Sequence, residues 1–436
     1  MPAHNKRFDE IGGKVITRTS ARPLTVSDSI YQIQNYKVMK QRFLLYLLSV
    51  VTLTYSCSSR KQTDDSFGAK EIIIDPNSRQ IGKLTLSNIA ESLEYIPLET
   101  MDECLIGDIS SSILSENYLL LYCRIALRCY LFSRSGRFIA PIGSFGQGPG
   151  EYSYGLELIQ IDETNEKVIL KTSNPNQLLY YDFKGRHIES VPLDIISGNM
   201  SYHNSFYLIK TRNDGNTPYS YTLLSEDFNI VTQGIVPIPF TTIPAGSSSG
   251  GGVVFCQYIY NNRVHVRENL LNDTLYMINQ DYSIIPKYII NAGKYDFTAD
   301  IRSNSNLFLS EFRSMTNYLI VNSLFETKDF VLVSYRFSTD PNIPCYYSKH
   351  EGKLLYFTSI SGIPNDYDGG LDFWPKYQFN NQLIAFHHAF QIDEQKGNSN
   401  KLKPSGTPEA INRYEQLSQK IDVEDNPVMV IVNLKK

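Results

Sequence analysis

The sequence has no strong excess of charge of either sign. Its 436 residues include 41 Lys and Arg against 45 Asp and Glu, which gives a formal net charge of −4. Proteins that bind nucleic acid or anionic surfaces concentrate positive charge, so neither partner is expected. With 42% hydrophobic and 20% charged residues, the composition is that of an ordinary globular chain.

Recognisable catalytic motifs are also missing. The G-x-S-x-G match, GSSSG at residues 246–250, lies in a serine- and glycine-rich run that is typical of a flexible loop, so it does not indicate a nucleophile-elbow hydrolase. His387 and His388 are neighbours and would face opposite sides of a strand, and the remaining histidines show no metal-ligand spacing. Adjacent carboxylates such as Asp162 and Glu163 fall in turns, where charge is normally solvated. We therefore predict no catalytic residues and no cofactor.

The longest apolar run is too short to cross a membrane. A spanning helix needs about 20 consecutive apolar residues, whereas residues 43–55 offer thirteen that hydroxyl side chains interrupt. Two basic residues precede this run, and Ser56 stands before Cys57, which is the layout of a secretory signal with a lipid-attachment cysteine. We predict a lipoprotein signal peptide at residues 39–56 and a lipid on Cys57. The alternatives are an ordinary cleaved signal and a signal anchor. One departure from the lipoprotein pattern is Thr54, which stands where the lipid-attachment motif usually has leucine.

The signal divides the chain into four parts. Residues 1–38 contain no apolar run. Because signals begin near the start codon, we predict that translation starts at Met39 and that 1–38 is untranslated or disordered. Residues 57–70 are polar and predict a flexible tether. Residues 71–436 form the folded body.

Cysteine is scarce, with six residues in the chain. If Cys57 carries lipid, an odd number remains, so at least one thiol is free or paired elsewhere. Cys123 and Cys129 flank RIALR between two strand-like runs, and a hairpin there would bring them close enough for a disulfide. Two small buried free cysteines are the alternative.

Aromatic residues are abundant except for tryptophan, with 30 Tyr, 22 Phe and one Trp. Tyr and Phe favour strands. Beyond residue 71, short apolar runs such as KVILKT and FVLVSYRF alternate with Gly, Asn, Asp and Pro. This spacing predicts an all-β sandwich, barrel or propeller.

A recurring unit favours the propeller. A strand ending in an aromatic residue, a polar turn and a second strand recur five times. The turn residues are Gly136, Gly185, Asn229, Asp281 and Gly352, at intervals of 49, 44, 52 and 71 residues. Repeats of about 40–50 residues are typical of propeller blades.

The C-terminal segment adds a helix and a last strand. Thr407–Ile421 is predicted to be helical, with Thr407 as N-cap and Pro408 at the first position. Val428–Leu434 has the composition of a buried strand. Because propellers pair a terminal strand into the blade begun at the other end, we predict that it pairs with strands from the N-terminal part of the body.

Several short motifs occur in the order expected for a known family. They are YIPLET (Tyr95–Thr100), IGSFGQGPGEY (Ile142–Tyr152), NDTLY (Asn272–Tyr276), FWP (Phe373–Pro375) and DNPVMVIVNLK (Asp425–Lys435). Over about residues 70–436 the chain resembles the six-bladed β-propeller lipoproteins of Bacteroides-type bacteria, which are related to NHL-repeat propellers. The resemblance implies a six-bladed all-β propeller with a short C-terminal helix and a closing C-terminal strand. It also implies export as a lipoprotein and, for most members, no assigned activity.

One loop combines acidic and aromatic residues. DYDGGLDFWP, residues 366–375, includes Tyr367, Asp368, Phe373 and Trp374. Such loops bind sugars by stacking and hydrogen bonding, or Ca²⁺ through carboxylates, so these four residues are the candidate ligand-binding set. A blade-connecting loop with a partly buried tryptophan is the alternative.

Two functions fit these features. The first is a non-catalytic binding module for a glycan, a peptide or a partner protein. The alternative is a metal-dependent hydrolase or lyase with a divalent metal in the propeller channel, which rests on fold analogy. We expect an outer-membrane lipoprotein that meets the membrane through its lipid only. The periplasmic side is favoured over the cell surface, because no acidic cluster lies between Cys57 and residue 64.

Overall fold

The computed structural model describes residues 68–436, with gaps at 154, 195–198, 204–205, 212–218, 236–254, 269–272, 397–403 and isolated positions between 299 and 339. Gly68–Lys436 forms one compact unit. The stretch 1–38, the predicted signal peptide at 39–56, Cys57 and the tether up to residue 67 lie outside the described residues. Among the helices described, none is long and apolar enough to cross a membrane.

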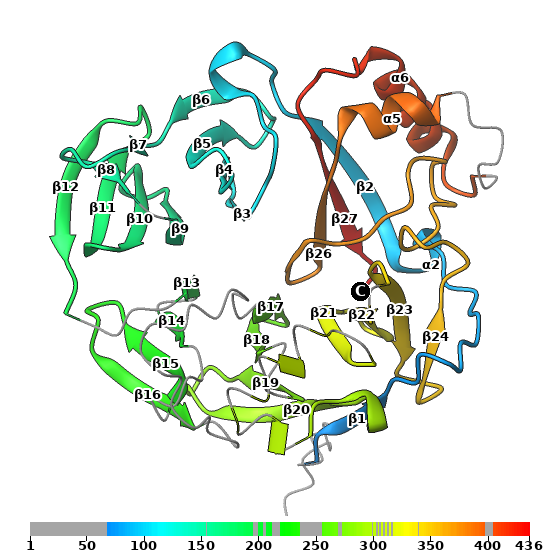
Figure 1. Ribbon diagram of the computed structural model, residues 1–436. Helices are drawn as coiled ribbons and strands as arrows, with labels where there is room; N and C mark the ends of the chain where they lie inside the picture. Colours follow the sequence, from blue (N-terminus) through cyan, green and yellow to red (C-terminus); the bar gives the residue numbers. More distant parts are fainter. Residues whose placement is uncertain are drawn as a thin grey trace, which may run out of the picture. The chain divides into compact units, whose positions relative to one another are not determined.

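Four antiparallel sheets of four strands each make up much of this unit (Figure 1). Their strands are β3 (Ser111–Leu114), β4 (Tyr118–Cys123), β5 (Arg128–Ser133) and β6 (Phe138–Pro141); β9 (Leu156–Asp162), β10 (Lys167–Ser173), β11 (Asn176–Asp182) and β12 (His187–Pro192); β13 (Asn199–His203), β14 (Phe206–Lys210), β15 (Tyr219–Ser225) and β16 (Ile230–Ile235); and β21 (Leu319–Glu326), β22 (Phe330–Phe337), β23 (Ile343–Ser348) and β24 (Lys353–Tyr356). In each sheet the strand that comes first in the chain lies nearest the common centre. These strands are β3, β9, β13 and β21, and their placement makes the arrangement propeller-like.

The remaining long strands form a nine-stranded sheet in the order β1-β20-β19-β18-β17-β25-β26-β27-β2. They are β1 (Lys70–Ile73), β2 (Ala90–Pro97), β17 (Phe255–Tyr260), β18 (Arg263–Glu268), β19 (Thr274–Ile278), β20 (Ile284–Asn291), β25 (Tyr377–Phe379), β26 (Gln382–His387) and β27 (Val428–Leu434). The prediction of six blades was therefore wrong: four separate blades are present. The physical reason is the parallel pair Ile259–Phe379, which joins β17 to β25 and merges the other strands into one sheet.

Short elements complete the fold. A two-stranded parallel sheet of β7 and β8 lies in the glycine-rich motif after β6, and the helices are short except for α6. These elements are β7 (Ser144–Phe145), β8 (Glu151–Tyr152), α2 (Leu86–Ile89), α5 (Ala389–Gln395), α6 (Pro408–Lys420) and the 3-10 turns η1 (Asp102–Cys104) and η2 (Gly293–Tyr295).

The structure confirms the recurring strand–turn–strand unit found in the sequence. All five of its turn residues lie between the third and fourth strands of a four-strand group. Gly136 and Gly185 adopt left-handed backbone, with φ of +87° and +76°. A Cβ at Gly136 would overlap the carbonyl oxygen of Pro97 in β2, and one at Gly185 would overlap that of Pro141 in β6. At these two turns, glycine therefore allows the turn to pack closely on the adjacent sheet.

The C-terminal predictions are confirmed. Thr407 is the N-cap of α6, and its Oγ1 accepts a hydrogen bond from the Ala410 N–H at 3.2 Å. The last strand, β27, pairs antiparallel with β2 over its whole length and with β26 on its other side. The two ends of the folded unit are thus joined in one sheet, in which β27 is paired on both sides.

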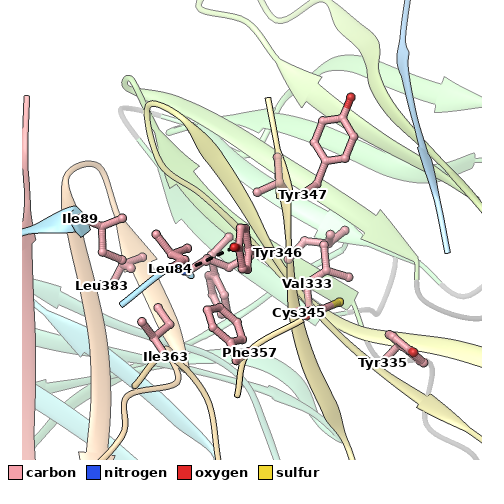
Figure 2. Packing of buried hydrophobic residues seen from close by; sticks show 14 of the residues in the cluster. Leu84, Ile89, Val333, Tyr335, Cys345, Tyr346, Tyr347, Phe357, Ile363 and Leu383 are labelled. Carbon is pink, nitrogen blue, oxygen red and sulfur yellow. Dashed lines mark hydrogen bonds between the residues drawn. The ribbon is translucent and has the colours of Figure 1, made fainter. Parts of the chain in front are cut away.

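The largest hydrophobic core lies between β21–β24 and the strands that flank them (Figure 2). Tyr346 crosses from β23 towards Leu84, whose N–H donates to the tyrosine oxygen at 3.3 Å. The Phe357 ring packs on Tyr346 with a centroid distance of 5.0 Å. Each fully buried large apolar side chain here contributes about 1.5–3 kcal/mol. This cluster includes Phe373, so it also supports the loop that carries the predicted site.

The predicted disulfide is wrong. The structure gives both Cys123 and Cys129 as buried free thiols. In the β4–β5 register Cys129 lies opposite Tyr122, so Cys123 points to the other face of the sheet. The two side chains belong to different hydrophobic clusters. Burial accordingly raises the pKa of the Cys123 thiol to about 12.

Candidate functional site

A cavity of about 760 Å³ lies beside the core of β21–β24. Its walls come from β21 and β22, from Asn342 just before β23, from the long loop between β24 and β25, and from β26 and α5. Figure 1 shows α5 directly after β26 and close to α6. The Tyr414 hydroxyl of α6 donates to Gln395 of α5 at 2.7 Å, which holds the short helix against its neighbour. The volume is in the range of small-molecule sites in proteins.

Trp374 provides an aromatic wall of the cavity and is the single tryptophan of the chain. Its indole N–H donates to the Ser323 hydroxyl at 3.3 Å, and Ser323 shares a 2.6 Å hydrogen bond with Ser334. The Phe357 ring meets the indole edge-on, with centroids 6.2 Å apart. These contacts fix the orientation of a ring that remains partly exposed.

His387 ends β26 and also lines the cavity. Only 7% of its surface is exposed, and its Nδ1 is buried with no hydrogen-bond partner among the described residues. Burial, helped by the neighbouring His388, lowers its pKa to about 4. The ring is therefore neutral near pH 7. His388 is exposed and its N–H instead donates to Gln391 at 3.1 Å, so the two histidines differ in environment as the sequence predicted.

Most other polar groups on the walls are neutral amides and hydroxyls. They include Asn322, Asn342, Thr358, Ser359, Gln391 and Gln395. The two charged side chains, Asp372 and Lys376, are of opposite sign and both have partners. Asp372 accepts from the Asn365 N–H at 3.1 Å, and the Lys376 ammonium donates to the Ile109 carbonyl. The cavity thus combines the aromatic side chains of Phe325, Trp374 and Phe386 with uncharged groups that both donate and accept hydrogen bonds.

A separate charged cluster surrounds Glu326 at the end of β21. Lys287 and Lys349 contact its two oxygens at 2.7 and 2.6 Å. The Tyr288 and Tyr258 hydroxyls also donate to it, at 3.1 and 3.3 Å. Burial would raise the pKa of Glu326, but the two ammonium groups outweigh it and lower the pKa to about 2. The cluster links the nine-stranded sheet to β21–β24.

A family model described as a domain of unknown function (DUF4934) matches residues 70–433. The chain belongs to the DUF4934 family. A search of curated proteins found no significant match.

Among solved structures, this DUF4934 chain is similar to a candidate exported protein of Bacteroides fragilis, with a TM-score of 0.60 and 18% identity. The match covers 85% of this chain and 100% of that one. A DUF4221 family member of Bacteroides vulgatus matches with a TM-score of 0.41 and 10% identity, over 79% and 97% of the two chains. The first similarity supports the propeller-like fold. The narrower resemblance to six-bladed NHL-like lipoproteins is not confirmed.

The structure separates the four predicted ligand-binding residues. Trp374 lines the cavity, whereas Phe373 is 1% exposed and belongs to the core. The Tyr367 hydroxyl donates to the Glu91 carbonyl at 2.8 Å. Asp368 is buried, and its Oδ1 accepts from Asn365 and from the Tyr95 hydroxyl at 2.9 and 3.2 Å. Ligand binding by these four residues stays a prediction.

Other cavity residues were missed because they lie far apart in the sequence. Ser323 and Ser334 interrupt the apolar strands LIVNSLFE and FVLVSYRF. An isolated hydroxyl in a buried strand was the available signal. Within the described part of the chain, no group of three or more His, Cys, Asp or Glu is placed to hold a metal ion.

Proposed function

We propose that this DUF4934 protein is an exported, non-catalytic binding module that takes up a small polar ligand in the cavity beside Trp374. The composition of the cavity walls is the main support for this proposal. An oriented, partly exposed indole stands among neutral hydrogen-bonding groups, with the buried His387 ring beside it. Small-molecule sites have this pattern of an apolar surface with a few convergent polar groups.

Two observations support export. The segment before Cys57 has the layout of a lipoprotein signal. The similar Bacteroides fragilis protein is described as a candidate exported protein. We propose lipid attachment at Cys57 and a place at the outer membrane, on its periplasmic side. The metal-dependent hydrolase or lyase has no observation in its favour among the described residues, since they bring no ligand set together.

A cavity-blocking variant tests the binding module. Thr358 is exposed and lines the cavity, so Thr358→Trp fills the space without removing core contacts. The full chain is screened by thermal shift against pools of saccharides, short peptides and other small polar compounds. Compounds that bind in the cavity are expected to stabilise the wild type and to lose this effect in Thr358→Trp.

A control places the same side chain elsewhere. Ile125 is 88% exposed in the turn between β4 and β5 and does not line the cavity. Ile125→Trp should respond to every compound as the wild type does. Stabilising compounds that act equally on Thr358→Trp and on the wild type would show that the cavity is not the binding site.

A further inference from the structure

We infer that the cavity takes a neutral saccharide and that His387 helps to select it through a hydrogen bond from its ring to a sugar hydroxyl. This inference rests on the proposed function, because it names the ligand class for the same cavity.

The size of the cavity limits the ligand. Its volume of about 760 Å³ suits a small molecule rather than a folded partner, because small-molecule pockets measure about 300–1,000 Å³. A short oligosaccharide, or the end of a longer glycan, fits this range. The walls come from β21, β22, β26, α5 and the loop between β24 and β25.

The charges of the walls favour a neutral ligand. Asp372 and Lys376 sum to zero, and each is already held by a backbone group. His387 is uncharged near pH 7, and the nearby His388 is exposed. An anionic or cationic ligand would lose hydration on entry and find no unpaired opposite charge.

The neutral polar groups match hydroxyls better than ions. Side-chain amides and hydroxyls both donate and accept hydrogen bonds, as sugar hydroxyls do. Gln391 is exposed at the start of α5 and lines the cavity, so its amide can reach a ligand. Trp374 supplies an oriented ring on which the C–H face of a sugar can stack. The two features together are those of a saccharide site.

His387 adds selectivity because neither ring nitrogen has a hydrogen bond among the described residues. Its Nδ1 is enclosed by protein, so Nε2 is the nitrogen that a ligand can reach. A neutral imidazole carries one proton, and either nitrogen can hold it. A hydroxyl can pair with Nε2 in both forms, whereas a peptide N–H or carbonyl can pair in only one.

The experiment compares three ligand classes on the full-length protein, purified in a detergent without a sugar headgroup. Neutral mono- to tetrasaccharides, uronic-acid saccharides and uncharged tetrapeptides are titrated by calorimetry. We expect neutral saccharides to bind and the other two classes to fail. His387→Phe should weaken saccharide binding by about tenfold, which is the loss of one hydrogen bond. His387→Gln should recover part of the affinity.

A second variant does not touch the core. Gln391→Ala should weaken saccharide binding by about threefold, whereas Gln419→Ala, an exposed position of α6 away from the cavity, should leave it unchanged. This comparison keeps the inference testable even if His387→Phe does not fold.

The outcomes separate the inference from the function on which it rests. Tetrapeptides or uronic acids that bind and are blocked by Thr358→Trp would uphold the binding module and overturn the saccharide. Saccharides that bind His387→Phe and the wild type equally would overturn the role of His387. If nothing from any class is blocked by Thr358→Trp, both proposals fall.

Discussion

The Glu326 carboxylate is held by cations and hydroxyls that come from two sheets. It is 2% exposed, whereas Lys287 and Lys349 are 24% and 19% exposed. The buried carboxylate therefore relies on its protein partners to stabilise its charge, whereas the two ammonium groups also remain partly in contact with water. Removing one member of such a buried group leaves an uncompensated charge, which costs about 3–5 kcal/mol.

Glu326→Gln should lower the free energy of unfolding by about 3 kcal/mol at pH 7, measured by chemical denaturation. Glu326 has a lowered pKa in the folded state, so its contribution is present above the unfolded pKa of about 4.3 and is lost as pH falls towards 2. The difference between variant and wild type should therefore shrink at pH 3. Glu351→Gln, in an exposed pair with Lys353, is the control and should cost less than about 1 kcal/mol. Equal effects of both substitutions would contradict the account.

Three buried histidines predict a second dependence on pH. Burial lowers the pKa of His203 and His265 to about 3 and that of His387 to about 4. The unfolded chain binds protons below about pH 6.5 while these folded rings do not, so stability is present above that pH and lost as pH falls. Each histidine should remove about 2 kcal/mol of stability between pH 7 and pH 5.

Substitution of His387 isolates its contribution to the pH dependence of stability. Over the same pH range His387→Phe should lose about 2 kcal/mol less than the wild type in urea unfolding. His350→Phe changes an exposed turn residue and serves as the control. A His387→Phe profile parallel to the wild type would show that this ring is protonated in the folded protein.

Sequence reasoning found part of the cavity. Trp374 was identified because a lone tryptophan in an acidic, glycine-containing loop stands out in the sequence. Its neighbours Asp368 and Phe373 share that pattern, but they stabilise the loop and the core. His387 was not selected as a ligand contact, because only the three-dimensional structure shows that the end of β26 borders the cavity.

Among the elements, β27 joins the two ends of the folded unit. Its middle residue Ile431 is fully buried and lies opposite Glu94 on β2 and Ile384 on β26.

The positions of strands, turns and the C-terminal helix could be predicted from local signals in the sequence, namely apolar runs, turn glycines and the Thr407-Pro408 cap. Those signals act within a few residues, which is why the sequence reveals them.

Ile431→Pro should destabilise the protein by about 3 kcal/mol or more, because proline removes a ladder hydrogen bond from a strand paired on both sides. Ile188→Pro is the matched control. Ile188 lies at the bulge of the edge strand β12, where proline is tolerated, and should cost less than about 1 kcal/mol. Thermal and urea unfolding would measure both. A mild Ile431→Pro effect would show that the β2–β27 closure contributes little.

For the whole molecule, the blade count could not be predicted from repeats. Merging of the sheets depends on the contact between Ile259 and Phe379, two residues 120 positions apart. Long-range pairing of this kind leaves no local pattern in the sequence. The propeller-like arrangement was predictable because every repeat contributes to it, whereas a single junction changes the number of sheets.

Substitution of Cys57 tests the proposed lipid attachment. Cys57→Ser should abolish incorporation of a labelled fatty acid and release the protein from the membrane fraction of its bacterial host. Ser58→Ala should leave both unchanged. Persistent labelling of Cys57→Ser would show that the cysteine is not the lipid site.

Because the chain has a single tryptophan, ligand binding in the cavity beside Trp374 can be measured directly. Acrylamide quenching of tryptophan fluorescence in the wild-type protein reports the exposure of this one indole. A neutral saccharide that binds by calorimetry should protect Trp374 from quenching, with the same dissociation constant in both measurements. A saccharide that binds but leaves quenching unchanged would contradict the account, because the ligand would then occupy another site.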